Sequence, residues 1–549
     1  MRFINPIPPI PRRNFLQLSA GAFAYSSLNQ SPVQLINARD TGAQGDGRTL
    51  NTTALQKAID HASSAGGGTV VIPAGDFLTG GLVLRSHVTL HLEPGAILRG
   101  SQRIEDYAYH PGPPIEGDAN GHHLLFALDA EDIAITGYGS IDGGGSAFWH
   151  RKDRPSPRPE DLWADVIAWD YEPATPRRPS PMIEFARCRN VRIEGVTLTN
   201  TPGWTLRPVA CETVLIRGIR VRNPIYAPNT DGMDITACRN VFISDCDIAT
   251  GDDAICIKSE NPYGELLPTK NITVTNCVLS TCCNGFKIGT ATHGRVENIV
   301  FSNSVIYNES STPLNQRATS GIALEVVDGG SMSGVLISNI QMENVRTPIF
   351  VRLGRRTATS NSFLRGIRFE QIHATGALLT SSISGLSEMP VEDVVIANSS
   401  FHTSEHGHAA WTHAAIPEHP EKYPEARMFG RLPASAIYVR HANAIRITNT
   451  EFKADLPEER PVIVCDDVHD LELRGLTTSA PSSNEAAIAM HNTTDALLQG
   501  VRLTQQAAAL LHLTGSSSQH IVLLSNDLSR VGTPTIHSDG ATAEAIVSL

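Results

Sequence analysis

The 549-residue chain lacks an apolar run long enough to cross a bilayer, so we expect no integral membrane segment in the mature protein. It also lacks a basic excess, because 44 lysines and arginines stand against 56 aspartates and glutamates, giving a net charge of −12. An acidic balance argues against a nucleic-acid partner. It provides no long-range attraction to an acidic polysaccharide either, so such a substrate would need local cations.

The sequence also lacks a disulfide framework, because its nine cysteines are an odd number and cannot all pair with one another. Several recur just before predicted strands, where small buried apolar residues can stack in ladders; these are Cys188, Cys211 and Cys238. Cys282 and Cys283 have no second pair of ligands at a zinc-site spacing. We therefore expect no metal and no other cofactor.

The N-terminus has the pattern of an export signal. Arg12-Arg13-Asn14-Phe15-Leu16-Gln17 precedes a weakly apolar stretch, which resembles a twin-arginine signal. We expect residues 1–30 to be this signal, to be removed, and to direct a bacterial protein to the periplasm or the exterior. The alternative is a basic tail beside a short helix.

One pattern recurs along most of the chain. Residues 189–198 and 212–221 both have apolar residues at positions three, five, eight and ten, which predicts a strand, a sharp bend and another strand. An asparagine side chain at the turn can satisfy the bent backbone, as expected for Asn190, Asn240, Asn271 and Asn298. The same pattern begins at Glu131, Arg189, Glu212, Arg239, Lys270, Glu297, Ser333, Arg365, Glu392, Asn443, His469, Thr494 and Gln519.

Repeats of about 23 to 27 residues cannot bury their apolar faces alone, but a stack of them can. The sequence therefore predicts an all-β fold, a parallel β-helix forming one domain over residues 36–549. A β-propeller would need roughly 40 to 50 residues per blade. A helix over residues 52–64, with Asn51 or Thr52 as its N-cap, can cover the open end of the solenoid and its exposed strand edges.

Two insertions interrupt the repeats, at residues 143–180 and 404–436. Long loops in a compact repeat protein are usually functional or disordered, and we expect these two to form walls of a substrate cleft. The second insertion carries four histidines at irregular spacing, which argues against a metal site; they are His406, His408, His413 and His419.

Three aspartates lie in two short motifs that start the same kind of segment in neighbouring repeats. Asp231 lies in Asn229-Thr230-Asp231-Gly232, and Asp252 and Asp253 follow Gly251 about 21 residues later. Stacked repeats would bring the three carboxylates together, and clustered carboxylates have pKa values that are pushed apart. Glycoside hydrolysis requires such a division into an acid and a base.

These two motifs together resemble glycoside hydrolase family 28, the polygalacturonases and their relatives. The segments at 45–47, 66–75 and 139–143 also look like the N-terminal half of that family. The resemblance implies a right-handed parallel β-helix and metal-free hydrolysis with inversion. It also implies that Asp252 is the general acid, which should keep its proton near neutrality, and that Asp231 and Asp253 activate water.

Two further motifs of the family are altered. Asn284 stands where a histidine is usual, and Gly321-Ile322-Ala323-Leu324-Glu325 replaces a motif whose arginine and lysine grip a galacturonate carboxylate. Alternation places Lys287 outward, one rung from Ala323, with Glu325 outward nearby. Lys287 could serve as the substrate cation, or it could merely pair with Glu325 at the surface. We expect a pectin-type polysaccharide or oligosaccharide as substrate, but not plain homogalacturonan.

Further candidates for contact with the substrate are Asn229, Asn284, Glu325, Lys258, Trp204, Arg352 and the segment Tyr423–Gly430. The arginine fork of Arg352 matches a carboxylate. Alternatives to hydrolysis are a non-catalytic carbohydrate-binding protein and a Ca²⁺-dependent lyase like the pectate lyases, because a parallel β-helix supports all three. We expect a monomer.

Overall fold

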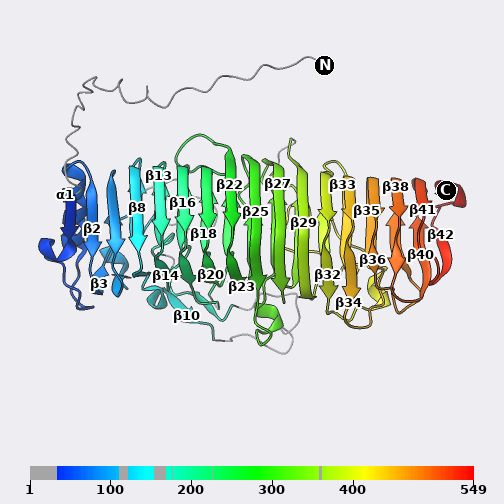
Figure 1. Cartoon of the computed structure of the whole chain (residues 1–549), viewed down its shortest axis with the longest axis horizontal. Coiled ribbons are helices and arrows are strands. Elements are labelled where there is room, and N and C mark those ends of the chain that lie inside the picture. The colour runs from blue at the N-terminus through cyan, green and yellow to red at the C-terminus, as the bar shows by residue number, and fades with distance from the viewer. Residues whose placement is uncertain are drawn as a thin grey trace, which may run out of the picture.

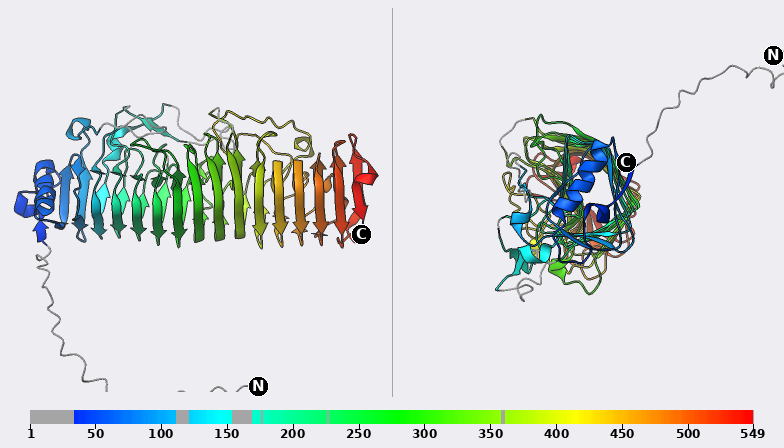
Figure 2. Two further views of the ribbon diagram at one scale, coloured as in Figure 1. Left: turned by 90° about the horizontal axis from the view of Figure 1, so that it is seen from above. Right: turned by 90° about the vertical axis from the view of Figure 1, so that its left-hand side faces the viewer.

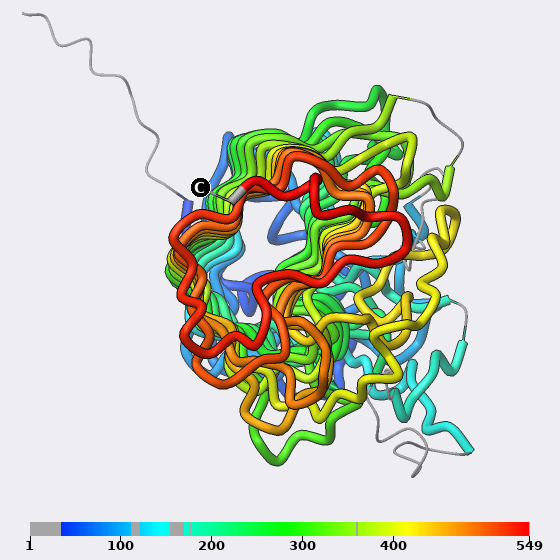
Figure 3. The backbone as a smooth tube through the Cα atoms, turned by 90° about the vertical axis from the view of Figure 1, so that its right-hand side faces the viewer, coloured from blue at the N-terminus to red at the C-terminus, as the bar shows by residue number. Residues whose placement is uncertain are grey.

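The computed structural model describes residues 34–110, 121–153, 169–175, 177–225, 227–357 and 361–548. The strands stack as successive coils along one long axis, and the predicted parallel β-helix is confirmed (Figure 1). Viewed along this axis, the coils superimpose and the long loops lie to one side of them (Figure 3). The predicted export signal over residues 1–30 lies outside the described residues.

Parallel pairing divides the strands into three faces, and some long strands belong to two of them. The first face consists of β1 (Gln34–Asn37), β2 (Gly68–Ile72), β5 (Val88–Leu92), β8 (Glu131–Gly137), β13 (Arg189–Glu194), β16 (Glu212–Arg217), β19 (Arg239–Ser244), β22 (Thr269–Thr275), β25 (Arg295–Tyr307), β27 (Ser331–Glu343), β29 (Phe363–Ala377), β31 (Val391–Ala397), β33 (Ile437–Thr448), β35 (Ile463–Arg474), β38 (Thr494–Gln499), β41 (Gln519–Leu524) and β43 (Ile546–Ser548).

The second face follows the bend after the first and shares β25, β27 and β29 with it. Its other strands are β3 (Gly75–Thr79), β6 (Ala96–Gly100), β9 (Ser140–Asp142), β14 (Thr197–Thr199), β17 (Arg220–Arg222), β20 (Asp247–Thr250), β23 (Val278–Thr281), β32 (Ser400–Thr403), β34 (Glu451–Ala454), β36 (Thr477–Thr478) and β39 (Arg502–Leu503).

The third face carries the candidate site described below, and it shares β33 and β35 with the first face. Its other strands are β4 (Leu82–Val83), β7 (Leu125–Leu128), β12 (Ile183–Ala186), β15 (Leu206–Val209), β18 (Met233–Thr236), β21 (Ile255–Lys258), β24 (Asn284–Ile288), β26 (Ser320–Val326), β28 (Thr347–Leu353), β30 (Ser381–Ser384), β37 (Ala486–His491), β40 (Ala507–Thr514) and β42 (Val531–Ser538). A separate antiparallel pair joins β10 (Trp149–Arg151) to β11 (Tyr171–Pro173) in the first insertion.

The predicted repeat register is confirmed along the first face. Each predicted repeat start from Glu131 to Gln519 is the strand partner of the next one, without a shift. The asparagines lie at the predicted turns, where their backbone is left-handed, with φ of 57° at Asn240 and 58° at Asn271. The side-chain amide of Asn271 donates to Asn240 Oδ1 at 3.0 Å, so the turns also form a ladder.

The interior of the solenoid is one continuous apolar core. The nine cysteines are all free and buried. The backbone amide of Cys188 lies 3.4 Å from the sulfur of Cys211, and the amide of Cys211 contacts the sulfur of Cys238 in the next coil. Cys188, Cys211 and Cys238 are therefore small ladder residues, as predicted. No helix among the described residues is long and apolar enough to span a bilayer.

The predicted capping helix is confirmed as α1 (Thr52–Ser64), which covers the N-terminal end of the coil stack (Figure 1). It buries Leu55 and Ile59 against the core. Asn51 occupies the N-cap position, but its side chain does not cap the helix. Instead it accepts from the amide of Gln44 and donates to the carbonyl of Leu78, so it ties the helix start to the first coils.

Candidate active site

Two tight turns begin neighbouring strands of the third face, Asn229–Gly232 before β18 and Gly251–Asp253 before β21. The second turn is held by hydroxyl groups, because Thr250 and Thr281 both donate to the carbonyl of Asp252 at 2.6 Å. Gly251 cannot be replaced there, since a Cβ would collide with the carbonyl oxygens of Ala227 and Pro224. Close backbone packing therefore fixes the directions of the aspartates that follow.

The turns bring all three predicted aspartates into the wall of one cavity of about 280 Å³. All three are at least nine-tenths buried. The residues that line this cavity are Trp169, Trp204, Asn229, Asp231, Asp252, Asp253, Lys258, Cys283, Thr290, Ala291, Tyr423 and Glu425. Both insertions contribute, the first through Trp169 and the second through Tyr423 and Glu425.

Asp253 is the best-paired carboxylate of the three. Its Oδ1 accepts from the side-chain amide of Asn284 at 2.7 Å, and its Oδ2 lies 3.2 Å from Lys287 Nζ. Burial by itself raises the pKa of Asp253, but the Lys287 charge and the Asn284 hydrogen bond outweigh it and hold the pKa below its usual value. Asp253 is therefore an anion at neutral and mildly acidic pH.

Asp252 has the opposite shift. Burial, and then the charge of Asp253, raises its pKa to about 6, even though Oδ2 accepts from the backbone amide of Asn229 at 2.9 Å. A neutral carboxyl in a cavity that also holds an anionic carboxylate matches the acid and base of glycoside hydrolysis. The contacts of Asn229 and Asn284 are with these carboxylates.

The protonation of Asp231 differs from what the sequence led us to expect, which was that Asp252 alone keeps a proton. Burial, and then the charges of Asp252 and Asp234, raises the pKa of Asp231 well above its usual value. Its Oδ1 has no hydrogen-bond partner among the described residues. Since the carboxyls interact closely, they titrate as a set, and Asp231 shares in holding the protons of that set.

Lys287 and Glu325 do not form the exposed surface pair considered above. Both side chains are at most 2% exposed, and Lys287 Nζ lies 3.8 Å from Glu325 Oε2 and 3.3 Å from the hydroxyl of Tyr423. Burial raises the pKa of Glu325 to about 8. Sequence alternation correctly predicted the register of Lys287 opposite Ala323, but not that the second insertion covers it or that Asp253 is its nearest anion.

Lys258 lines the cavity and lies over the ring of Trp204, 5.2 Å from its centroid. Its other contact is Asp234, at 3.8 Å. Burial raises the pKa of Asp234 to about 7 despite the Lys258 charge. Asp234 was not among the predicted site residues, although alternation marks it as outward, because Met233 and Ile235 on either side both point into the core.

Arg352 is absent from the residues that line the cavity. Its guanidinium donates to the carbonyl of Gly385 at 3.0 Å and to that of Glu418 at 2.8 Å, and it stacks over Phe429. Backbone carbonyls, one of them from the second insertion, therefore occupy the fork that we expected to bind a sugar carboxylate. Arg352 holds the insertion on the third face instead.

The first insertion reaches the catalytic turn through Trp169, whose indole N–H donates to the carbonyl of Gly251 at 2.8 Å. The two insertions project from the same side of the β-helix (Figure 2). Nothing in the repeat pattern identifies Trp169, because it lies in a segment without periodicity. Only the folded chain shows which residue of the insertion approaches the aspartates.

Comparison with known proteins gives a consistent result. The model of the family described as glycosyl hydrolases family 28 matches residues 63–407, more than half of the chain. A probable polygalacturonase of Vitis vinifera is 28% identical over 387 residues, which cover 66% of this chain and 73% of that protein. An endo-polygalacturonase of Pectobacterium carotovorum subsp. carotovorum is 28% identical over 342 residues, 61% of this chain and 79% of that one. A solved exopolygalacturonase of Thermotoga maritima superimposes with a TM-score of 0.57 at 28% identity, covering 68% of this chain and 88% of the other.

Proposed function

Because the chain belongs to glycosyl hydrolase family 28 and is an O-glycosyl hydrolase of the polygalacturonase type, we propose that it cleaves pectin-type chains with inversion at the anomeric carbon. The observation that carries this proposal is the division of charge in one cavity. Asp252 has a pKa raised to about 6, while Lys287 and Asn284 keep Asp253 ionised beside it.

In this proposal Asp252 donates its proton to the oxygen of the leaving sugar. Asp253 accepts a proton from the water that attacks the opposite side of the anomeric carbon. Asp231 helps to position that water, and its raised pKa makes it a poorer base than Asp253. One carboxylate oxygen of Asp252 lies within 4.8 Å of one of Asp253, closer than the roughly 6.5 to 9.5 Å typical of an inverting acid–base pair, so the anomer of the first product is the measurement that decides the stereochemistry.

We further propose that the preferred substrate is not plain homogalacturonan. Lys287 is almost fully buried and is engaged by Asp253, Glu325 and Tyr423. Lys258 is then the only lysine or arginine among the described residues that line the cavity, whereas four acidic residues line it. One available cation offers little favourable charge to a chain with a carboxylate on every sugar, so a mixed or branched backbone fits better.

The charge arrangement also bears on the lyase alternative. Asp252, Asp253 and Cys283 could together approach a metal ion, but Ca²⁺ prefers six to eight oxygen ligands. The Lys287 ammonium, 3.2 Å from Asp253, already supplies the positive charge at this carboxylate. This supports hydrolysis over Ca²⁺-dependent elimination.

The test is product release from polygalacturonate, rhamnogalacturonan, xylogalacturonan and short oligomers, by the wild type and by Asp252→Asn. We expect one mixed or branched substrate to be cleaved fastest, with the initial anomer inverted when followed by proton NMR. Asp247→Asn, which removes a half-exposed carboxylate paired with Arg222, is the control and should retain activity.

Fast cleavage of unsubstituted polygalacturonate would contradict the substrate proposal but not the mechanism. Products with an unsaturated ring, formed only with Ca²⁺, would indicate a lyase instead. Binding without turnover on every substrate would indicate a carbohydrate-binding protein.

A further inference from the structure

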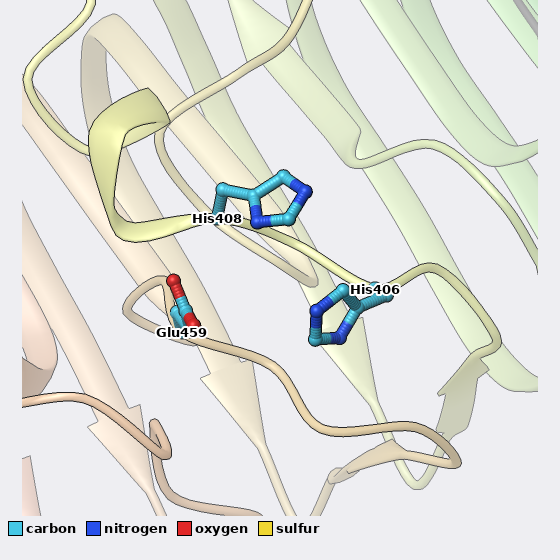
Figure 4. Close-up of side chains that lie close together, drawn as sticks. All are labelled: His406, His408 and Glu459. Atoms are coloured by element: carbon cyan, nitrogen blue, oxygen red, sulfur yellow. The ribbon is translucent and has the colours of Figure 1, made fainter.

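A second cluster of polar side chains lies away from the cavity, where the second insertion leaves the coil stack. His406 and His408 belong to the first residues of the insertion, and Glu459 belongs to the turn between β34 and β35. One potential metal-ligand atom from each of the three residues lies within 4.8 Å of the others. Figure 4 shows the side chains approaching one another from these two separate loops.

Close backbone packing brings the two loops together. Gly407, between the two histidines, leaves no room for a side chain, because a Cβ there would collide with Glu458 and Arg460. The amide of Glu459 donates to the carbonyl of Gly407 at 3.3 Å. The histidines on either side of Gly407 are therefore held beside Glu459.

The tautomer of His406 is set by its surroundings. Its Nδ1 lies 2.5 Å from the carbonyl oxygen of Pro457, which can only accept a hydrogen bond. Nδ1 must therefore carry a proton, and in the neutral ring Nε2 retains a free lone pair. Metal-binding histidines typically donate their second nitrogen to a carbonyl or carboxylate in this way.

Glu459 differs from the other two acidic residues of this junction. Arg431 and Arg460 neutralise Glu405, and Arg460 also pairs with Glu458. Glu459 forms no salt bridge within the described part of the chain; its Oε2 accepts from the amide of Ala409 at 2.8 Å, which leaves Oε1 available. An unneutralised carboxylate thus faces two imidazoles.

We propose that His406, His408 and Glu459 bind a divalent transition-metal ion of the Zn²⁺ type. Two imidazoles and one carboxylate form a common three-ligand set for zinc, with water completing the tetrahedron. Imidazole nitrogen favours Zn²⁺ and its neighbours in the first row over Mg²⁺ or Ca²⁺. The exposed side chains would move inward until the ligand atoms lie about 2.0 to 2.2 Å from the ion.

The bound ion would clamp the base of the second insertion to the next coil. The same insertion carries Tyr423 and Glu425 into the wall of the catalytic cavity. The metal therefore has a structural role, and it takes no part in the hydrolysis. Because the site stands apart from the aspartates, it can be tested independently of the proposed function.

The test is calorimetric titration of the untagged, metal-stripped full chain with Zn²⁺. We expect one equivalent to bind to the wild type, and we expect His408→Ala and Glu459→Gln each to weaken binding at least tenfold. Co²⁺ provides a second measurement, because its visible absorption band reports tetrahedral nitrogen and oxygen ligands directly. Circular dichroism verifies that the variants are folded, which we expect because His406 and His408 are exposed.

His413→Ala is the matched control, since His413 lies in the same insertion but faces Glu485 at 3.3 Å. It should bind Zn²⁺ as the wild type does. Undiminished binding by the His406→Ala/His408→Ala double variant would overturn the proposal and point to the cluster at Asp252 instead. Absence of a stoichiometric site in the wild type, or an equal loss in His413→Ala, would also overturn it.

Discussion

The first and third faces of the solenoid carry ion pairs of similar length but with different consequences. On the first face, Arg239 lies 2.9 Å from Glu212 with both side chains about one-third to one-half exposed. On the third face, Lys287 lies 3.2 Å from Asp253 with both side chains at most 5% exposed. Arg239, Glu212 and Lys287 occupy outward positions of stacked strands, and Asp253 lies in the turn just before one. The insertion over the third face makes the difference between the two pairs. Desolvation turns an ordinary surface pair into a group that controls the pKa values of the site.

The largest expected effect comes from removing the proposed acid. Asp252→Asn should lower kcat by about 10²–10⁴-fold, because the leaving sugar then departs without a proton. Steady-state kinetics on the fastest substrate measures this, beside the Asp247→Asn control. A variant that retained more than a tenth of wild-type kcat would remove Asp252 from the mechanism.

The buried pair should respond strongly to the loss of one partner. Lys287→Met leaves the buried carboxylate of Asp253 without its cation, and we expect the free energy of unfolding to fall by about 3–5 kcal/mol. The pKa of Asp253 should rise as well, which moves the acidic limb of the pH–rate profile to higher pH. Denaturant titration and a pH–rate profile measure the two effects. Lys270→Met, on the first face, should change neither, and an unchanged acidic limb in Lys287→Met would contradict the role of Lys287.

The pH dependence of wild-type activity should reflect the raised pKa of Asp252 and the lowered pKa of Asp253. Asp252 must be protonated to act, so kcat/KM should fall about tenfold per pH unit above its pKa of about 6. Asp253 must be ionised, and its lowered pKa should keep the activity high through the mildly acidic range. The bell-shaped profile is measured on the free enzyme as kcat/KM, and an optimum above neutrality would contradict this assignment.

The smallest effect is expected on the first face. Arg239→Ala breaks the pair with Glu212, and the free energy of unfolding should change by only about 0–1 kcal/mol, since exposed pairs contribute little. Added salt should reduce even this difference. If the free energy of unfolding fell as far as in Lys287→Met, burial would not explain the difference between the two ion pairs.

Much of the fold could be predicted because it follows from a local period. Apolar alternation decides which side chains point inward, so the repeat starts from Glu131 to Gln519 pair as expected. The same rule predicted that Lys287 lies opposite Ala323. The turn asparagines were predictable for a related reason, since a left-handed bend in every coil favours that side chain.

The site was predictable only in part. Asp231 meets Asp252 and Asp253 because the two motifs that carry them occupy equivalent positions in stacked repeats. Asp234 was missed, although alternation marks it as outward, and Arg352 was assigned to a substrate that it does not face. Its real partners, the carbonyls of Gly385 and Glu418, include one from an insertion that has no period from which a contact can be inferred.

The coil stack, its register, its capping helix and the meeting of three carboxylates could therefore be predicted, because each depends on spacing along the chain. Which outward side chains are buried depends on the folded chain. The insertions that carry Trp169 and Tyr423 fold back across the third face; burial there raises the pKa of Asp252, whereas Lys287 and Asn284 hold the pKa of the equally buried Asp253 down. Desolvation depends on what covers a residue, and in this protein the cover comes from segments distant in sequence.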